Sequence, residues 1–198
     1  MRLDSAAAFD VLYITHSLQR TAGGLMPAEL HLFGYLACVL WLYTGRTAHG
    51  WGYAFLGTEL GAPFSPAMDV AVTELTARGF LGPAGERLRM SSVAEDRLQP
   101  LRSLELNRDR TECLDAACAS TSAFSLGMIG GALAQDPELQ RARAVPLTRQ
   151  LLERPARAVL YRHFEALKKN LPRTELDLRV PAVVWLGALH SLGRNLES

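Results

Sequence analysis

Histidine and serine are the residue types in this sequence that most often carry out catalysis or bind metal, but their spacing here predicts neither. No two histidines form an H-x3-H pair. The serine-rich run ASTSAFS, at residues 119–125, lacks the G-x-S-x-G elbow that exposes a catalytic serine. We therefore predict that the chain is not an enzyme and has no catalytic residue, metal site or cofactor. The histidines are His16, His31, His49, His163 and His190, and we single out His49 because it lies in a glycine-rich stretch beside Trp51 and Tyr53.

The cysteines and the apolar stretches bear on the cellular compartment. Cys38, Cys113 and Cys118 are an odd number, and one C-x4-C spacing without neighbouring histidine pairs does not define a metal site. We expect free core thiols in a reducing cytoplasm. The N-terminus lacks the basic and apolar regions of a signal peptide. The apolar stretches at 32–43 and 180–189 are shorter than the ~20 residues that span a bilayer, so we expect a cytoplasmic protein without membrane contact.

Charge is distributed unevenly along the chain. The formal net charge is only +1, which by itself favours neither nucleic acid nor an anionic membrane as a partner. Residues 1–140 hold 10 Lys or Arg against 15 Asp or Glu, whereas residues 141–179 hold 10 against 4. The basic segment either contacts nucleic acid or neutralises the acidic N-terminal half, within one chain or across a homodimer. Its candidate nucleic-acid-binding residues are Arg154, Arg157, Lys168 and Lys169.

Apolar periodicity and capping residues predict a series of helices followed by a hairpin in the N-terminal half. Ser65 is a favoured N-cap, Pro66 a favoured first helical residue and Gly79 a favoured residue just after a helix. The expected elements are helices at residues 5–20, 27–44 and 54–60, a helix from Pro66 to about residue 78, strands from Phe80 and Glu86 joined by a turn at 82–85, and a helix from Ser91 or Ser92 to about residue 106.

The C-terminal half shows only helical patterns. A helix expected at 111–134 has small residues at four-residue spacing, namely Ala119, Ala123, Gly127 and Gly131, which would let another helix approach closely. The contacting helix is either internal or from a partner. A basic helix is expected at 151–171, broken or started at Pro155, and an apolar one at 181–192.

The order of elements around the Pro66 helix is similar to that of a known superfamily. Glu59-Leu60-Gly61, Ser65-Pro66, Leu75 and Arg78-Gly79-Phe80-Leu81 resemble the common pattern of winged-helix regulators, over about residues 28–106. The resemblance implies a mainly α fold, a winged helix-turn-helix with a two-stranded wing followed by a C-terminal helical bundle. We accordingly expect an N-terminal helix and winged-helix domain at 1–106 and an all-helical region at 107–198.

In a winged helix, the outward side of the third helix enters the major groove of DNA. With Met68, Val72 and Leu75 turned inward, this side is flanked by Asp69 and Glu74. Groove-reading helices usually present Arg, Lys, Asn or Gln, and carboxylates near a duplex oppose binding. We therefore predict that the face binds another protein. The predicted partner-binding residues are Pro66, Val70, Thr73 and Ala77, and Arg87 and Arg89 on the wing are candidates for phosphate contact.

Three hypotheses about function follow. The stretch FDVLYITHSLQR with the winged helix resembles the small middle components of three-gene systems built around SMC-like ATPases, such as Lamassu-type antiphage defence, and the winged-helix accessory subunits of bacterial condensins. This resemblance implies a non-catalytic subunit that contacts an ATPase and an effector, with nonspecific DNA contact and homodimer formation left open. The alternative is a DNA-binding transcription regulator with a C-terminal dimerisation or sensing region. A third hypothesis is a small-molecule sensor whose pocket is lined by Trp51, Tyr53 and Phe55.

Overall fold

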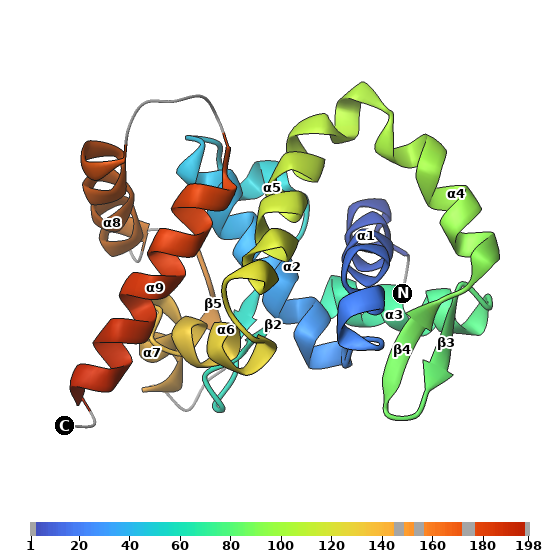
Figure 1. Cartoon of the computed structure of the whole chain (residues 1–198), viewed down its shortest axis with the longest axis horizontal. Coiled ribbons are helices and arrows are strands. Elements are labelled where there is room, and N and C mark those ends of the chain that lie inside the picture. The colour runs from blue at the N-terminus through green and yellow to red at the C-terminus, as the bar shows by residue number, and fades with distance from the viewer. Residues whose placement is uncertain (1–2, 145–148, 153–156, 172–176, 197–198) are drawn as a thin grey trace.

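The structure is a computed structural model that describes residues 3–144, 149–152, 157–171 and 177–196. It is mainly helical, with two small antiparallel sheets, which confirms the mainly α prediction (Figure 1). The helices are α1 Ser5–Ala22, α2 Pro27–Tyr43, α3 Pro66–Ala77, α4 Ser92–Arg102, α5 Arg108–Ala119, α6 Leu126–Leu133, α7 Pro137–Arg143, α8 Arg157–Asn170 and α9 Arg179–Leu196. The strands are β1 Leu56–Gly57, β2 Pro63–Phe64, β3 Leu81–Ala84, β4 Arg87–Met90 and β5 Arg149–Gln150.

Helices α1 and α2 form the centre of the molecule. The Asp4 carboxylate caps α1 by accepting a hydrogen bond from Ala7 N at 2.9 Å, and Gly23 ends the helix at φ +70. Pro27 occupies the first turn of α2. Because α2 is apolar nearly all round, it is buried along most of its length and packs against both α1 and α5.

Helix α3 begins and ends at the predicted residues. The Ser65 hydroxyl accepts a hydrogen bond from Met68 N at 3.5 Å, and Pro66 lies in the first turn. Gly79 follows the C-cap residue and has a left-handed conformation, with φ +72. Met68, Ala71 and Leu75 are buried, so that α3 packs against α1. The side chain of Met68 leaves no room for a Cβ at position 34 of α2, where the chain has glycine.

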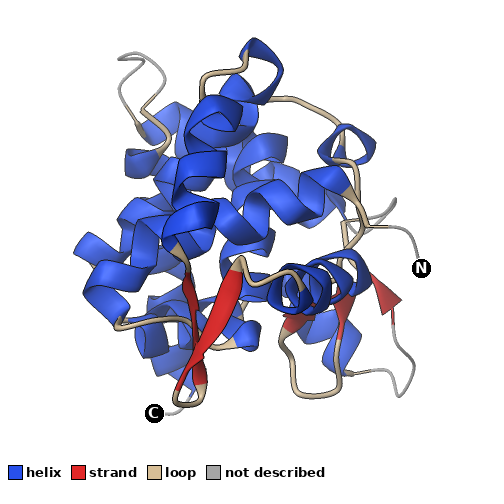
Figure 2. Ribbon diagram, turned by 90° about the vertical axis from the view of Figure 1, so that its right-hand side faces the viewer, coloured by secondary structure: helices blue, strands red, loops and turns tan. Residues whose placement is uncertain are grey.

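The hairpin β3–β4 follows α3 directly and pairs Leu81 with Met90 and Ala84 with Arg87 (Figure 2). Leu25, between α1 and α2, adds an isolated antiparallel bridge to Leu88 of β4, in which each residue donates its amide to the carbonyl of the other at 3.0 and 2.8 Å. The hairpin is therefore attached to the α1–α2 connection as well as to α3.

The long connection between α2 and α3 differs from the sequence-based expectation. The helix predicted at 54–60 is wrong: this stretch contains β1, which pairs with β2 on one side and with β5 on the other. Gly57 in β1 explains part of the difference, since a Cβ there would lie 2.1 Å from the Cβ of Ala142 in α7. The chain is extended here because it joins a small sheet and lies directly under α7.

The helix predicted at 111–134 is also interrupted. Helix α5 ends at Ala119, a short 3-10 turn follows, and α6 runs at 116° to the preceding segment. The row of small residues therefore does not lie on one helix. A Cβ on Gly127 or Gly131 would meet nothing within 4 Å among the described residues, so these glycines do not serve close helix packing there. The helix expected to reach residue 106 ends earlier, at Arg102, just after Pro100.

The core extends from α1 to α9 without a break among the described residues, and α5 packs more extensively against α2 than against any C-terminal helix. A boundary at residue 106 stays a prediction. No single helix in the described ranges is long and apolar enough to cross a membrane. Two consecutive segments, 105–122 around α5 and α6 itself, would be long and apolar enough together, but they are bent by 116°.

Candidate functional site

The outer face of α3 is the surface that the sequence predicted as a protein-binding site. Pro66, Thr73 and Ala77 are exposed, whereas Val70 is only half-exposed. The Thr73 hydroxyl does not extend into solvent as a free donor, because it donates to the carbonyl of Asp69 at 3.1 Å. The face is therefore smooth, with small apolar groups and few free hydrogen-bond donors.

The charges around this face are acidic or neutralised. Asp69 is exposed, and Arg78 forms an ion pair with Glu74 at 3.0 Å one helical turn away. An exposed pair of this kind contributes little to stability, but it ties the cation at this end of α3 to a carboxylate. The described surface of α3 thus offers no unpaired cation to a phosphate.

The two arginines of the hairpin differ in their surroundings. Arg87 points inward and donates to the carbonyls of Ala22 and Gly24, at 3.3 and 2.9 Å, and pairs with Glu29 at 3.3 Å. Its guanidinium therefore holds β4 against the α1–α2 connection. Arg89 is exposed and has no hydrogen-bond partner within the described chain, so it alone of the two is available for a phosphate contact.

The basic residues of the C-terminal half are only partly described. Arg154 lies outside the described residues, and Arg157 begins α8. Lys168 lies 5.3 Å from the ring centre of Tyr43 and 3.7 Å from Glu165, so its charge is already engaged on α8. Lys169 is exposed.

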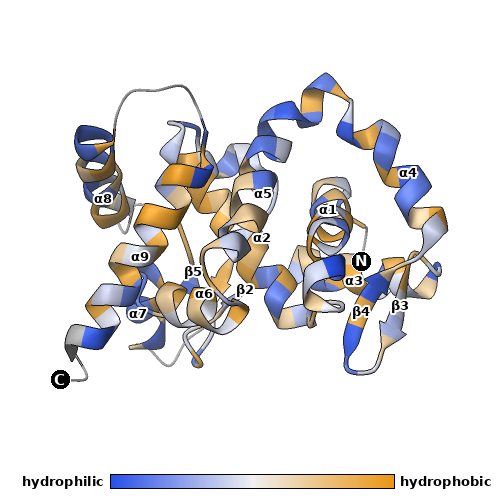
Figure 3. Ribbon diagram, in the orientation of Figure 1, coloured by the Kyte–Doolittle hydropathy of each residue, from blue (hydrophilic) through white to orange (hydrophobic). Residues whose placement is uncertain are grey.

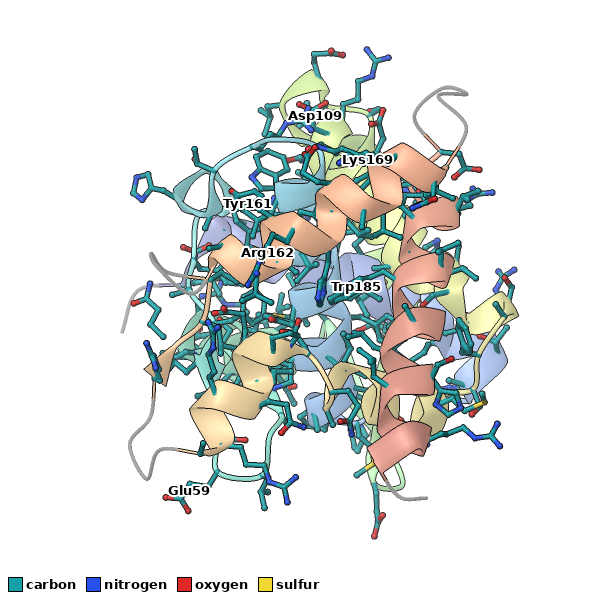
Figure 4. The ribbon with its side chains drawn as sticks, turned by 90° about the vertical axis from the view of Figure 1, so that its left-hand side faces the viewer. Glu59, Asp109, Tyr161, Arg162, Lys169 and Trp185 are labelled. Carbon is teal, nitrogen blue, oxygen red and sulfur yellow. The ribbon has the colours of Figure 1, made fainter. Side chains whose placement is uncertain are left out.

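The outer side of α8 carries a shallow hollow of about 440 Å³. Ala158 and Ala166 leave space between the longer side chains of Tyr161, Arg162 and Lys169, and Figure 4 shows the last three on the helix that crosses the front of the molecule. Helix α8 packs on α2 through Phe164, whose ring meets Tyr43 edge-on at 5.4 Å. The structure places none of the α8 cations beside the hairpin arginines, so the two sets do not form one basic surface.

The aromatic loop after α2 lines a cavity of about 640 Å³. Its lining includes His49, Tyr53 and Phe55 from this loop, together with Gln150 to Leu152. The two segments lie side by side, because Leu151 N donates to the carbonyl of Phe55 at 2.8 Å. Leu152 has φ +63, which is rare for a branched residue, and such strained backbone is concentrated at functional sites. Trp51, predicted with the other two aromatic residues, is instead fully buried and does not reach the cavity.

Behind the cavity lies a buried ionic cluster that the sequence did not reveal. Arg110 of α5 donates to the Asp10 carboxylate of α1 at 2.6 Å and to the carbonyl of Trp51, and its guanidinium lies 4.0 Å from the Trp51 ring centre. The Tyr53 hydroxyl donates to the same Asp10 oxygen at 2.5 Å. Complete burial raises the pKa of Asp10 to about 6, although Arg110 and Tyr53 both act to lower that pKa. The cluster joins α1, α5 and the aromatic loop.

A second buried carboxylate, Asp136, joins α2 to α7. It accepts a hydrogen bond from the Tyr35 hydroxyl at 3.1 Å and caps α7 by accepting from Glu138 N at 2.6 Å. Burial raises its pKa to about 7, despite these two hydrogen bonds, which lower it. Asp10 thus connects α1 to α5, and Asp136 connects α2 to α7.

The histidines and cysteines do not assemble into a reactive centre in the described part of the chain. His31 is buried and its Nδ1 accepts a hydrogen bond from Ser65 N at 3.2 Å, and burial lowers the pKa of His31. Cys113 is buried, which raises the pKa of its thiol to about 12 and makes it unreactive. No group of three metal-ligating side chains occurs among these residues.

Comparisons of the chain with protein-family models, with curated proteins and with solved structures find no match. The arguments about function therefore rest on the surfaces and the cavity described above.

Proposed function

We propose that this chain is a non-catalytic accessory subunit built on a winged helix, and that it acts through protein–protein contacts made by the outer face of α3. The order α1, α2, α3, β3, β4 and α4, with the hairpin attached to α1 and to Leu25, supports the winged-helix assignment. The long connection at 44–65 departs from the short turn of a helix-turn-helix.

A single observation carries the protein-binding role: the exposed face of α3 combines small apolar groups with a free carboxylate, and its one cation is paired. Such a face loses free energy beside a polyanion, because it repels phosphate and releases no counterions from DNA. Its small apolar groups can, however, be covered by another protein at low desolvation cost. The resemblance to the small middle components of SMC-like ATPase systems implies an ATPase and an effector as the partners.

The test is purification of the tagged full chain from a host that also expresses its neighbouring genes. We expect stable partners that are lost on Ala77→Arg and on Thr73→Arg, two exposed positions where the new side chain obstructs contact without altering the core. The matched control is Ala123→Arg, an exposed position beyond the end of α5, which should keep the partners. Partners that persist in all three variants would refute a role for this face.

The alternative, a DNA-binding regulator, is tested with the same variants. Binding of duplex DNA across a salt series should be absent or should depend on Arg89 and Lys169 rather than on α3. If a specific duplex is bound tightly and that binding is lost on Thr73→Asp, α3 reads DNA and the accessory-subunit proposal is wrong.

The cavity of about 640 Å³ favours a second function, recognition of a small molecule, because its size is that of ordinary ligand sites. Two aromatic rings and the imidazole of His49 in the cavity lining suit a planar ligand. A metabolite screen by thermal shift tests this: a ligand should raise the melting temperature of the native chain and should have a smaller effect on Tyr53→Leu than on Tyr161→Leu, a change on the outer face of α8.

A further inference from the structure

The outer side of α8 combines two unpaired cations with an exposed aromatic ring. Arg162 and Lys169 are exposed, and neither forms an ion pair with another described residue. Tyr161 is 39% exposed, and the ring of Phe164, nearly perpendicular to it with the ring centres 6.0 Å apart, supports it from the core side. The first three residues line the hollow of about 440 Å³ on this helix, and Figure 4 shows them at the front of the molecule with no other described helix over them.

The spacing along α8 leaves a gap between the two cations. Arg162 and Lys169 are seven positions apart, which is about two helical turns and roughly 10.5 Å along the axis. Ala166 lies between them on the same side, four positions after the first and three before the second. Because the methyl group of Ala166 is short, the surface is hollow here, and the ring of Tyr161 borders the same hollow.

The charges around the hollow favour an anion. Among its described lining residues only Glu165 carries a carboxylate, and this lies 3.7 Å from the ammonium of Lys168 on the same helix. Asp109, above Lys169 in the view of Figure 4, is paired with Arg46 at 2.5 Å. The potential at the hollow is therefore set mainly by the two cations that no described carboxylate neutralises.

A lipid surface does not fit this face. A helix that lies on a membrane directs its apolar side outward, whereas Leu160 and Phe164 of α8 are buried. Helix α9, which packs beside α8, does expose the apolar side chains of Val180, Val184 and Leu192, but these offer no charge to an anion. Figure 3 shows the difference, with α8 more hydrophilic than α9.

A flat group with an anion on each side is the repeating pattern of a nucleic-acid strand, in which phosphates alternate with nucleosides. We propose that the hollow on α8 binds single-stranded nucleic acid, with a base stacked on Tyr161 and the neighbouring phosphates bound by Arg162 and Lys169. Proteins that hold single strands without sequence preference combine cations along the backbone with aromatic rings on which the bases stack. This site is separate from the α3 face and does not depend on the function proposed for that face.

The hollow fits a single strand better than two other polyanions. A duplex keeps its bases paired and stacked in its interior, where the ring of Tyr161 does not reach them. An acidic peptide would meet the two cations but would leave the ring and the gap over Ala166 unused.

The test is fluorescence anisotropy of a labelled single strand of DNA, titrated with the full chain at several salt concentrations. Neither stacking nor phosphate contact requires a particular sugar, so DNA is a suitable probe. We expect the strand to bind more tightly than a duplex of the same length, with an affinity that falls as salt increases. Arg162→Gln and Lys169→Gln should each reduce the slope of log affinity against log salt by about 0.7, the value for one phosphate of a single strand. Arg194→Gln, which removes an exposed cation of α9, is the control and should leave the slope unchanged.

Two uncharged substitutions test the stacked base. Tyr161→Leu should weaken binding about fivefold or more without changing the salt slope, because stacking releases no counterions, and Tyr161→Trp should keep the affinity. Ala166→Leu fills the gap and should also weaken binding at an unchanged slope. Because all the substituted positions are exposed, circular dichroism melts should match those of the unmodified chain.

Several results would overturn the proposal. These are a duplex that binds as tightly as the single strand, a salt slope that Arg162→Gln and Lys169→Gln leave unchanged, and an affinity that survives Tyr161→Leu. Tighter binding of polyglutamate would identify an acidic peptide as the partner, and tighter binding of anionic lipid vesicles would identify a membrane; either would also overturn it.

Discussion

The buried pair between Asp10 and Arg110 offers the sharpest test of how this fold is held together. Replacing Arg110 by Met keeps most of the apolar stem that lies over Trp51 but removes the charge and both donated hydrogen bonds. The Asp10 carboxylate, which is fully buried, then has no counter-ion and keeps only the hydrogen bond from Tyr53. Removing one partner of a buried pair typically costs about 3–5 kcal/mol.

The loss should depend on pH, because it arises from an ionised Asp10. In the native protein the pKa of Asp10 is raised to about 6, and removing Arg110 removes the largest influence that lowers it. Above the native pKa, Arg110→Met forces either an unpaired charge or the uptake of a proton, and the full loss of stability appears. Below a pH of about 5 the carboxyl is protonated in the folded state and the loss becomes smaller. A second change, Asp10→Asn, removes the ionisable group and should recover much of the stability of Arg110→Met at neutral pH.

The assay is urea unfolding followed by circular dichroism, on either side of the Asp10 pKa. For a chain of this size, about 3–5 kcal/mol corresponds to a fall in melting temperature of roughly 6–20 °C. Arg108→Met, on the same helix but 67% exposed in its side chain, is the control and should change stability by no more than about 0.5 kcal/mol. An equal loss for Arg110→Met at both pH values, or no recovery on adding Asp10→Asn, would refute the reasoning.

Three further predictions concern other described contacts. Gly57→Ala should destabilise the fold by about 1–3 kcal/mol because its Cβ would overlap Ala142, whereas Gly131→Ala, which has open space, should stabilise α6 by up to about 1 kcal/mol; equal effects in thermal melts would contradict the glycine assignment. Burial raises the folded-state pKa of Asp136 from 3.8 to about 7, so its contribution to stability is fully present below about pH 4 and is lost as the pH rises toward 7. Asp136→Asn should therefore flatten this part of the plot of stability against pH. A plot that Asp136→Asn leaves unchanged would mean that Asp136 is not buried in this way. Arg87→Gln should lower stability while leaving any DNA binding unaltered, and a loss of binding without a loss of stability would show that Arg87 contacts phosphate.

Much of the N-terminal architecture could be predicted because its determinants are local. The cap at Ser65, the proline at 66 and the glycine at 79 act within one or two turns of α3, so the ends of that helix follow from neighbouring residues alone. The same holds for α1 and α2. The helix expected at 54–60 was wrong because β1 depends on pairing with β5, whose residues lie nearly a hundred positions later in the chain.

The candidate site was predictable to a lesser extent, for a physical reason of the same kind. The exposure of Pro66, Thr73 and Ala77 follows from helical periodicity once Met68 and Leu75 are assigned to the core. The direction of the Arg87 side chain could not be predicted in this way. Alternation along a strand places a side chain on one face of the hairpin, but it does not show whether a carboxylate lies on that side. The presence of Asp10 in an apolar helix was the only sign of the buried cluster, and its partner is 100 positions away.

The amino-acid sequence by itself determined the mainly helical class, the order of the N-terminal elements and the acidic character of α3, because propensity, capping and charge are properties of neighbouring residues. Only the tertiary structure decided which charged side chains are paired within the protein, which glycines are constrained and which apolar residues remain exposed on α9. These three features depend on contacts between segments that are distant in the sequence. The free energies of burial and of electrostatic interaction arise from such contacts rather than from neighbouring residues.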